Sequence, residues 1–232
     1  MKRVLSSLIA SVYLIIAVQF CLAQVNCQNS NALLDQKIDI DLSNTTMLFV
    51  VNKLAFNYRI PIGLEWASDH RQKVYEKMQT ENNIITWKND NLKIKSGTLR
   101  QVLDSLVLQE TQYKWECFEE VINIIPVESR DEFLKKLLDT KIKSFSPEKE
   151  LSKFSVRDML VETSEVRNLM NSEKVKLIKR DYPNSHYRYP DNEIIISASD
   201  TNFRSVLNKI VRTNIHKIWI VERLGNNFLV TF

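Results

Sequence analysis

Histidines and nucleophiles are the first side chains to test for chemistry in this sequence. His70, His186 and His216 are its three histidines, and none has a second ligand-type residue at a metal-binding spacing such as His-x-x-x-His. No Gly-x-Ser-x-Gly motif is present, and three glycines are too few for a loop that cradles phosphate. The sequence therefore predicts no metal, no cofactor and no catalytic residue.

One segment, residues 174–190, interleaves basic and aromatic side chains and contains Pro183 and Pro190. Such groups can stack on sugars or bases while they contact anions. The alternative, which we favour, is a long surface hairpin whose tyrosines pack on a sheet, because nearby acidic residues cancel the positive excess that a polyanion site needs. The candidate ligand-contact residues are Tyr182, His186, Tyr187, Arg188 and Tyr189.

Two cysteines, Cys27 and Cys117, remain if the first 23 residues are removed as an export signal. An even cysteine count in an exported chain favours a disulfide, and closing so long a loop would stabilise the fold by on the order of 4 kcal/mol. Cys27, however, lies in a polar stretch that we expect to be mobile. The disulfide and the unbridged alternative, with Cys117 as a core residue of a strand, therefore both stay open.

The first 23 residues have the layout of an export signal. Lys2 and Arg3 form a positive start, no charged side chain follows up to Ala23, and small residues stand where a signal peptidase reads. We expect cleavage before Gln24, a flexible segment over 24–36, and a periplasmic or extracellular mature protein. The alternative is that this segment is retained as a membrane anchor.

Composition narrows the classes of function. The formal charge of +4 falls to +2 when the signal is removed, because Lys2 and Arg3 leave with it. This excess is weak for a polyanion-binding protein, so we expect no nucleic-acid partner. A hydrophobic content of 44% with few glycines and prolines excludes a disordered or fibrous chain. No later stretch is apolar for long enough to span a membrane, and the mature chain can form one larger or two small domains.

Residues 37–126 are predicted to form a first module. Alternating apolar and acidic residues over 38–42 predict a half-buried strand, and apolar residues at helical spacing from Met47 to Tyr58 predict a helix. Pro61 ends that helix, and 60–66 reads as the next strand, so that the three elements make one βαβ unit.

A second unit follows an inserted segment at 69–89. Residues 92–95 alternate as a strand, Thr98 is a candidate N-cap, and apolar residues from Leu99 to Val107 line one face of a helix. Two short strands at 113–118 and 121–125, separated by two residues, predict a tight hairpin.

The helix and hairpin of this second unit recur near the end of the chain at a constant offset of 104 residues. The matched residues are Arg100, Val102, Leu103, Val107 and Trp115, which fall on Arg204, Val206, Leu207, Val211 and Trp219. A strand at 193–197 precedes the second helix, and a hairpin at 217–232 follows it. We interpret Trp115 and Trp219 as core anchors rather than ligand platforms.

The recurrence predicts an α+β fold of two small related modules, each with βαβ units, a mixed sheet packed by helices and a C-terminal β-hairpin. The first module covers 37–126, the second covers 151–232, and a helical linker over 127–150 joins them. The first half of the second module is read as a strand or helix entry at 154–156, a helix at 159–170 and a strand at 175–178.

Two stretches carry a resemblance to a known family. Residues 38–44 with the helix after them, and the run from Ile94 to Leu106 with its Gly97-Thr98-Leu99 turn, resemble the short N-terminal domain of secretins and TonB-dependent transducers. The likeness covers about 38–126 well and 150–232 less well. It implies a small two-βαβ fold that docks to periplasmic partners. No secretin pore or outer-membrane barrel follows here, so the resemblance supports the fold more than the role.

Taken together, the sequence favours a non-enzymatic exported protein that docks to another envelope protein, by strand addition at a sheet edge, or to an envelope polymer. The competing hypothesis is a secreted hydrolase of polysaccharide or peptide, with carboxylates facing each other in a site between the modules.

Overall fold

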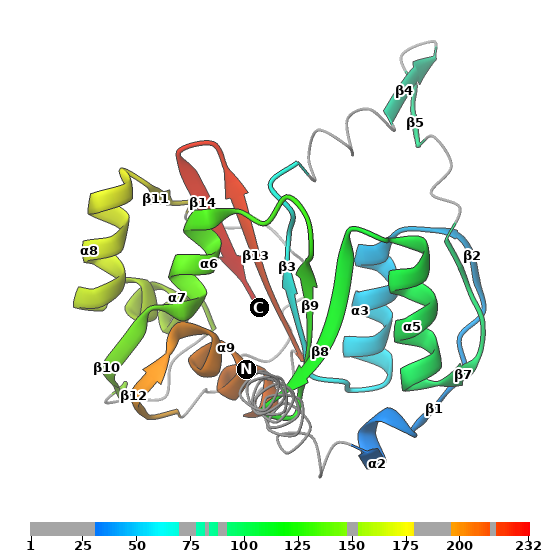
Figure 1. Cartoon of the computed structure of the whole chain (residues 1–232), viewed down its shortest axis with the longest axis horizontal. Helices are drawn as coiled ribbons and strands as arrows, with labels where there is room; N and C mark the ends of the chain where they lie inside the picture. Colours follow the sequence, from blue (N-terminus) through cyan, green and yellow to red (C-terminus); the bar gives the residue numbers. More distant parts are fainter. Residues whose placement is uncertain are drawn as a thin grey trace, which may run out of the picture.

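The computed structural model describes residues 31–69, 78–81, 84–87, 92–147, 153–178, 196–213 and 217–232. It shows an α+β protein in which a six-stranded mixed sheet has helices on both faces (Figure 1). The described part contains seven helices. The predicted export signal, residues 1–23, lies outside the described residues.

The six-stranded sheet combines strands from both predicted modules in the order β11-β14-β13-β3-β9-β8. Its strands are β3 (Ile62–Glu65), β8 (Tyr113–Phe118), β9 (Val121–Pro126), β11 (Lys176–Leu177), β13 (Ile218–Leu224) and β14 (Asn227–Thr231). The hairpins β8–β9 and β13–β14 are antiparallel, whereas the β3–β9, β11–β14 and β13–β3 pairs are parallel. The predicted hairpins at 113–125 and 217–232 are thus confirmed.

Three strands from the first half and three from the second have the same pairing pattern. In β3-β9-β8 and in β11-β14-β13, the first strand runs parallel to the second strand of a hairpin. Because β13 is parallel to β3, all three strand directions of one set are opposite to those of the other. The two sets have the same lateral order but opposite strand directions, so one set is turned over relative to the other within the sheet. The helices of the two halves therefore cover opposite sides of the sheet.

The helices and the two hydrophobic cores follow this arrangement. The helices are α2 (Asn31–Leu34), α3 (Met47–Asn57), α5 (Leu99–Gln109), α6 (Glu132–Asp139), α7 (Lys153–Val161), α8 (Ser164–Glu173) and α9 (Phe203–Thr213). One core joins α3 and α5 to the face that carries Ile62, Leu64 and Ile124. The other joins α6 to α9 to the face that carries Trp219 and Val221. Because side chains alternate between the two faces along a strand, β9 and β13 each contribute residues to both cores.

Four pairs of short strands complete the described structure. In the first half β1 (Lys37–Ile38) pairs with β7 (Gly97–Thr98), and β2 (Leu42–Thr45) pairs with β6 (Leu92–Ile94). In the second half β10 (Lys141–Phe145) pairs with β12 (Ala198–Asn202). A separate hairpin consists of β4 (Met78–Glu81) and β5 (Ile84–Trp87).

Side-chain caps begin the helices where the sequence predicts. Thr46 Oγ1 accepts from the Phe49 N–H at 3.2 Å, which starts α3 at Met47. Thr98 and Gln101 form a reciprocal capping box at the start of α5. In the second half Asn202 Oδ1 accepts from the Ser205 N–H at 2.7 Å. The predicted helices that begin near residues 47 and 99 are confirmed.

The interpretation of residues 38–66 as one βαβ unit was wrong in its pairing. The predicted strand at 38–42 is divided between β1 and β2, which pair with β7 and β6. Neither lies beside β3, since β9 and β13 occupy both edges of that strand. The strand predicted at 60–66 is confirmed as β3.

Three predictions for the second half also need correction. Residues 153–161 form helix α7, so the helix alternative for 154–156 is confirmed. The predicted helix at 159–170 is interrupted near Thr163, whose Oγ1 donates to the Leu160 carbonyl. The helical linker contains a strand, β10, that the sequence did not predict. The strand expected at 193–197 begins at Ala198 as β12, and 193–195 lie outside the described residues.

Candidate docking surface

The junction between β13 and β3 shows how one sheet edge in this protein receives another strand. The two strands are in register from Ile218 opposite Ile62 to Val221 opposite Glu65. The Ile62 N–H donates to the Lys217 carbonyl at 2.7 Å, and the Trp66 N–H donates to the Val221 carbonyl at 3.0 Å. The first half thus supplies a strand that extends the sheet of the second half.

A large side chain of β13 lies across the strand that it receives. Trp219 is fully buried, and its indole Nε1 donates to Asn208 Oδ1 on α9 at 2.9 Å. Gly63 stands opposite it in β3, where an added Cβ would lie 2.1 Å from the ring. The prediction that Trp219 is a core anchor is confirmed, and the strand beside it must have glycine at this position.

A buried carboxylate follows two residues after this glycine. Glu65 is fully buried, and both of its oxygens accept hydrogen bonds at 2.8 Å from Arg130. Arg204 at the start of α9 approaches the same carboxylate at 3.9 Å and forms an ion pair with Glu116 at 3.0 Å. The hydrogen bonds that Arg130 donates to Glu65 raise the pKa of the Arg130 guanidinium.

The outer face of α9 binds the acidic turn between β8 and β9. Glu119 accepts from Ser205 Oγ at 2.8 Å, and Arg212 forms an ion pair with Glu120 at 2.6 Å. Asn208 also reaches this turn, because its Nδ2 lies 3.4 Å from the Phe118 carbonyl. Helix α9 is therefore buried on two sides, by its own apolar core and by polar contacts with the first half.

The first half repeats part of this arrangement 104 residues earlier, on α5 and β8. Trp115 Nε1 donates to Asp104 Oδ1 at 2.9 Å, which matches the Trp219–Asn208 bond, and Arg100 lies 5.9 Å from the centre of the Trp115 ring. Trp115 is half-buried and packs on its core from the edge of the sheet. Within the described residues, β8 is the last strand on this side of the sheet.

We call the surface formed by Arg100, Asp104, Leu108 and Trp115 the β8–α5 face. Leu108 is 77% exposed and stands where α9 has Arg212, at the same offset. Leu108 therefore adds an exposed apolar side chain to the charged and aromatic side chains of this face.

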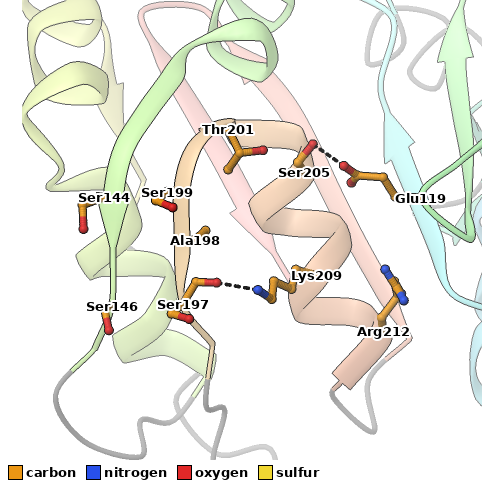
Figure 2. A pocket seen from close by; sticks show the side chains of 10 residues that line it. All are labelled: Glu119, Ser144, Ser146, Ser197, Ala198, Ser199, Thr201, Ser205, Lys209 and Arg212. Carbon is orange, nitrogen blue, oxygen red and sulfur yellow. Dashed lines mark hydrogen bonds between the residues drawn. The ribbon is translucent and has the colours of Figure 1, made fainter.

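A pocket of about 580 Å³ lies beside the junction, between α9, β10 and β12 (Figure 2). Its lining is rich in hydroxyl groups, with cationic side chains on α9. Lys209 Nζ donates to the Ser197 carbonyl at 2.5 Å, and Arg212 is paired with Glu120, so both cations already have protein partners. Glu119 is the single carboxylate among the described lining residues, so this pocket does not have the two facing carboxylates expected of a hydrolase site.

Most of the candidate residues predicted from sequence are not among the described residues. Tyr182, His186, Tyr187, Arg188 and Tyr189 lie outside the described residues, as does Cys27. Cys117 is half-buried in β8, next to the β8–α5 face. The Cys27–Cys117 disulfide therefore stays a prediction.

Metal and membrane criteria can be applied to the described ranges alone. The histidines His70, His186 and His216 are outside them. No group of three or more histidine, cysteine, aspartate or glutamate residues is placed there to hold a metal ion. Likewise, none of the helices in these ranges combines the length and apolar character needed to cross a bilayer.

Sequence reasoning missed the ion-pair cluster at the junction. A signal for it was present, because Glu65 interrupts an apolar strand of four buried positions, and Arg100 and Arg204 are matched in the repeat. A buried acid of this kind must find a cation. What the sequence could not supply was its partner, since Arg130 is 65 residues away.

Comparison with known proteins adds no relative. The chain matches no protein-family model, no curated protein and no solved structure.

Replacing Gly63 with alanine should destabilise the fold by about 3 kcal/mol, because the new methyl group would overlap the buried Trp219 ring. Urea unfolding followed by circular dichroism measures this. Gly225→Ala is the matched control: its Cβ meets nothing within 4 Å, and the positive φ of 61° should cost about 1 kcal/mol. Equal losses in the two variants would contradict the packing argument.

Replacing Arg130 with alanine should cost about 3–5 kcal/mol of unfolding free energy, because it leaves the buried Glu65 carboxylate with Arg204 alone at 3.9 Å. The control is Arg167→Ala, whose ion pair with Glu162 has side chains 58% and 56% exposed and should contribute less than about 0.5 kcal/mol. Chemical denaturation of both variants checks this, and a loss below about 1 kcal/mol for Arg130→Ala would refute it.

Proposed function

We propose that this chain is a non-enzymatic exported docking protein that accepts a strand of a partner protein along the outer edge of β8. The observation that carries this proposal is the parallel pairing of β13 with β3, since β13 is the strand that corresponds to β8 in the second half of the chain. A sheet edge offers backbone donors and acceptors in a row, and strand addition uses them for affinity.

The proposal includes a duplicated module related to the short N-terminal domain of secretins and TonB-dependent transducers. Three features support duplication. The two strand sets share one pairing pattern, the two indoles donate to side chains at matched helix positions, and β1–β7 pairs as β10–β12 does at the same offset. Lys37 opposite Thr98 corresponds to Lys141 opposite Asn202. Domain duplication gives each copy the same edge, and one of those edges is used within the chain.

A protein partner is favoured over an envelope polymer because of the kind of group that the edge presents. Backbone N–H and C=O groups of an edge strand recognise another polypeptide backbone. Leu108 beside this edge adds apolar area, which suits a folded or folding partner better than a hydrated polysaccharide. Export rests on the signal-like layout of residues 1–23.

Photocrosslinking in extracts of the source organism's exported proteins tests this function. A photoreactive residue in place of Lys114, which is exposed on β8, should give a discrete product with one partner, whereas the same residue in place of the exposed Lys135 on α6 should not. Leu108→Lys should lower the yield at position 114 at least about fivefold by removing apolar contact.

The matched control is Met159→Lys on α7, where the methionine is 43% exposed, and this change should leave the yield unchanged. A crosslinking pattern that is the same at positions 114 and 135, or a yield insensitive to Leu108→Lys, would overturn the proposed docking site.

A further inference from the structure

We propose that the β8 edge selects a partner strand with glycine opposite Trp115 and an acidic residue two positions later, running parallel to β8. This inference deepens the proposed function and rests on it. The template is β3, whose Gly63 and Glu65 meet the corresponding surface of β13 and α9 within the same chain.

The glycine requirement follows from how the indole is held. Trp219 is fixed by its bond to Asn208 and lies across the neighbouring strand, where a Cβ at position 63 would be 2.1 Å from the ring. Trp115 has the same bond, at the same 2.9 Å, to the matched residue Asp104. An indole anchored in this way projects past its own strand, so a strand added beside β8 must leave the position opposite Trp115 without a side chain.

The acidic residue follows from Arg100. In the second half Arg204 opens α9 and approaches Glu65, which stands opposite Val221, two residues beyond Trp219. Arg100 opens α5 at the matched position, is exposed and lies over the Trp115 ring. A carboxylate opposite Cys117 on an added strand therefore lies where Glu65 lies relative to Arg204. Arg100 supplies the opposite charge.

The outer faces of α9 and α5 differ, and this difference restricts the sequence of the partner further. Helix α9 receives the acidic turn through Ser205, Asn208 and Arg212, whereas the matched residues of α5 are Gln101, Asp104 and Leu108. Asp104 repels a second carboxylate, and Leu108 calls for an apolar side chain where Glu120 stands in the internal junction. The partner strand thus carries glycine, any residue and an acid in that order. It also places an apolar side chain, and not an acidic turn, near its amino-terminal end, because Glu120 lies beside the start of β3, where the Ile122 N–H donates to the Pro61 carbonyl.

Peptides made from the chain's own β3 sequence test this rule on the full-length protein. The probe is the peptide of residues 59–68, fluorescently labelled, and its binding is measured by anisotropy and localised by photocrosslinking from position 114. Two matched peptides carry Gly63→Val or Glu65→Lys, and each should bind at least about tenfold more weakly than the parent peptide. Protein variant Arg100→Glu should restore binding of the Glu65→Lys peptide, whereas Arg167→Glu, on the distant α8, should not.

The outcomes separate this rule from the function on which it rests. Equal binding of all three peptides at position 114 would overturn the glycine and acid rule while leaving strand addition intact. Failure of all three peptides, with a partner still captured at position 114, would also overturn the rule alone. Failure of both the peptides and the partner crosslink would overturn strand addition at β8 together with the rule.

Discussion

The contact between the Trp219 ring and Gly63 is the constraint on which the rest of the structure depends. Neighbouring strands lie about 4.8 Å apart, so a ring that reaches across to the next strand leaves no space for a side chain there. Gly63 provides that space, and β13 can then pair with β3 along four residue positions. This single parallel pair joins the strands of both halves into one sheet. Each half consequently completes its core against a sheet that is twice as wide as its own three strands.

The ion pairs of Glu65 then fix the register in which β3 pairs with β13. Glu65 lies on the same side of β3 as Gly63, facing Arg130 and Arg204. A slip of one residue would move the carboxylate to the opposite face, into the apolar core that contains Ile62 and Leu64. Such an uncompensated buried charge costs far more than the slip could recover. The cluster thus excludes wrong pairings of β3 with β13, while Arg212 and Glu120 hold the outer end of α9 near the β8–β9 turn.

The same helix and hairpin serve different purposes in the two halves. Helices α5 and α9 begin with side-chain caps and hold an indole by the same hydrogen bond, so their inner faces are alike. Their outer faces differ: α9 carries Asn208 and Arg212 against an acidic turn, whereas α5 carries Asp104 and the exposed Leu108. In the second half the surface is used inside the chain. In the first half the matched surface is the β8–α5 face.

The sequence by itself determined the local elements and their recurrence. The caps at Thr46 and Thr98, the helices after them and the hairpins at 113–126 and 218–231 depend on neighbouring residues and on periodicity, which a sequence displays directly. Tertiary structure decided the pairing of these elements. That β2 lies beside β6, that β10 exists, and that β3 joins β13 all depend on residues far apart in the chain. The partners of Glu65 and the indole that lies over Gly63 also come from distant parts of the chain. The sequence shows that an acid or a glycine stands at a position, but not which distant group contacts it.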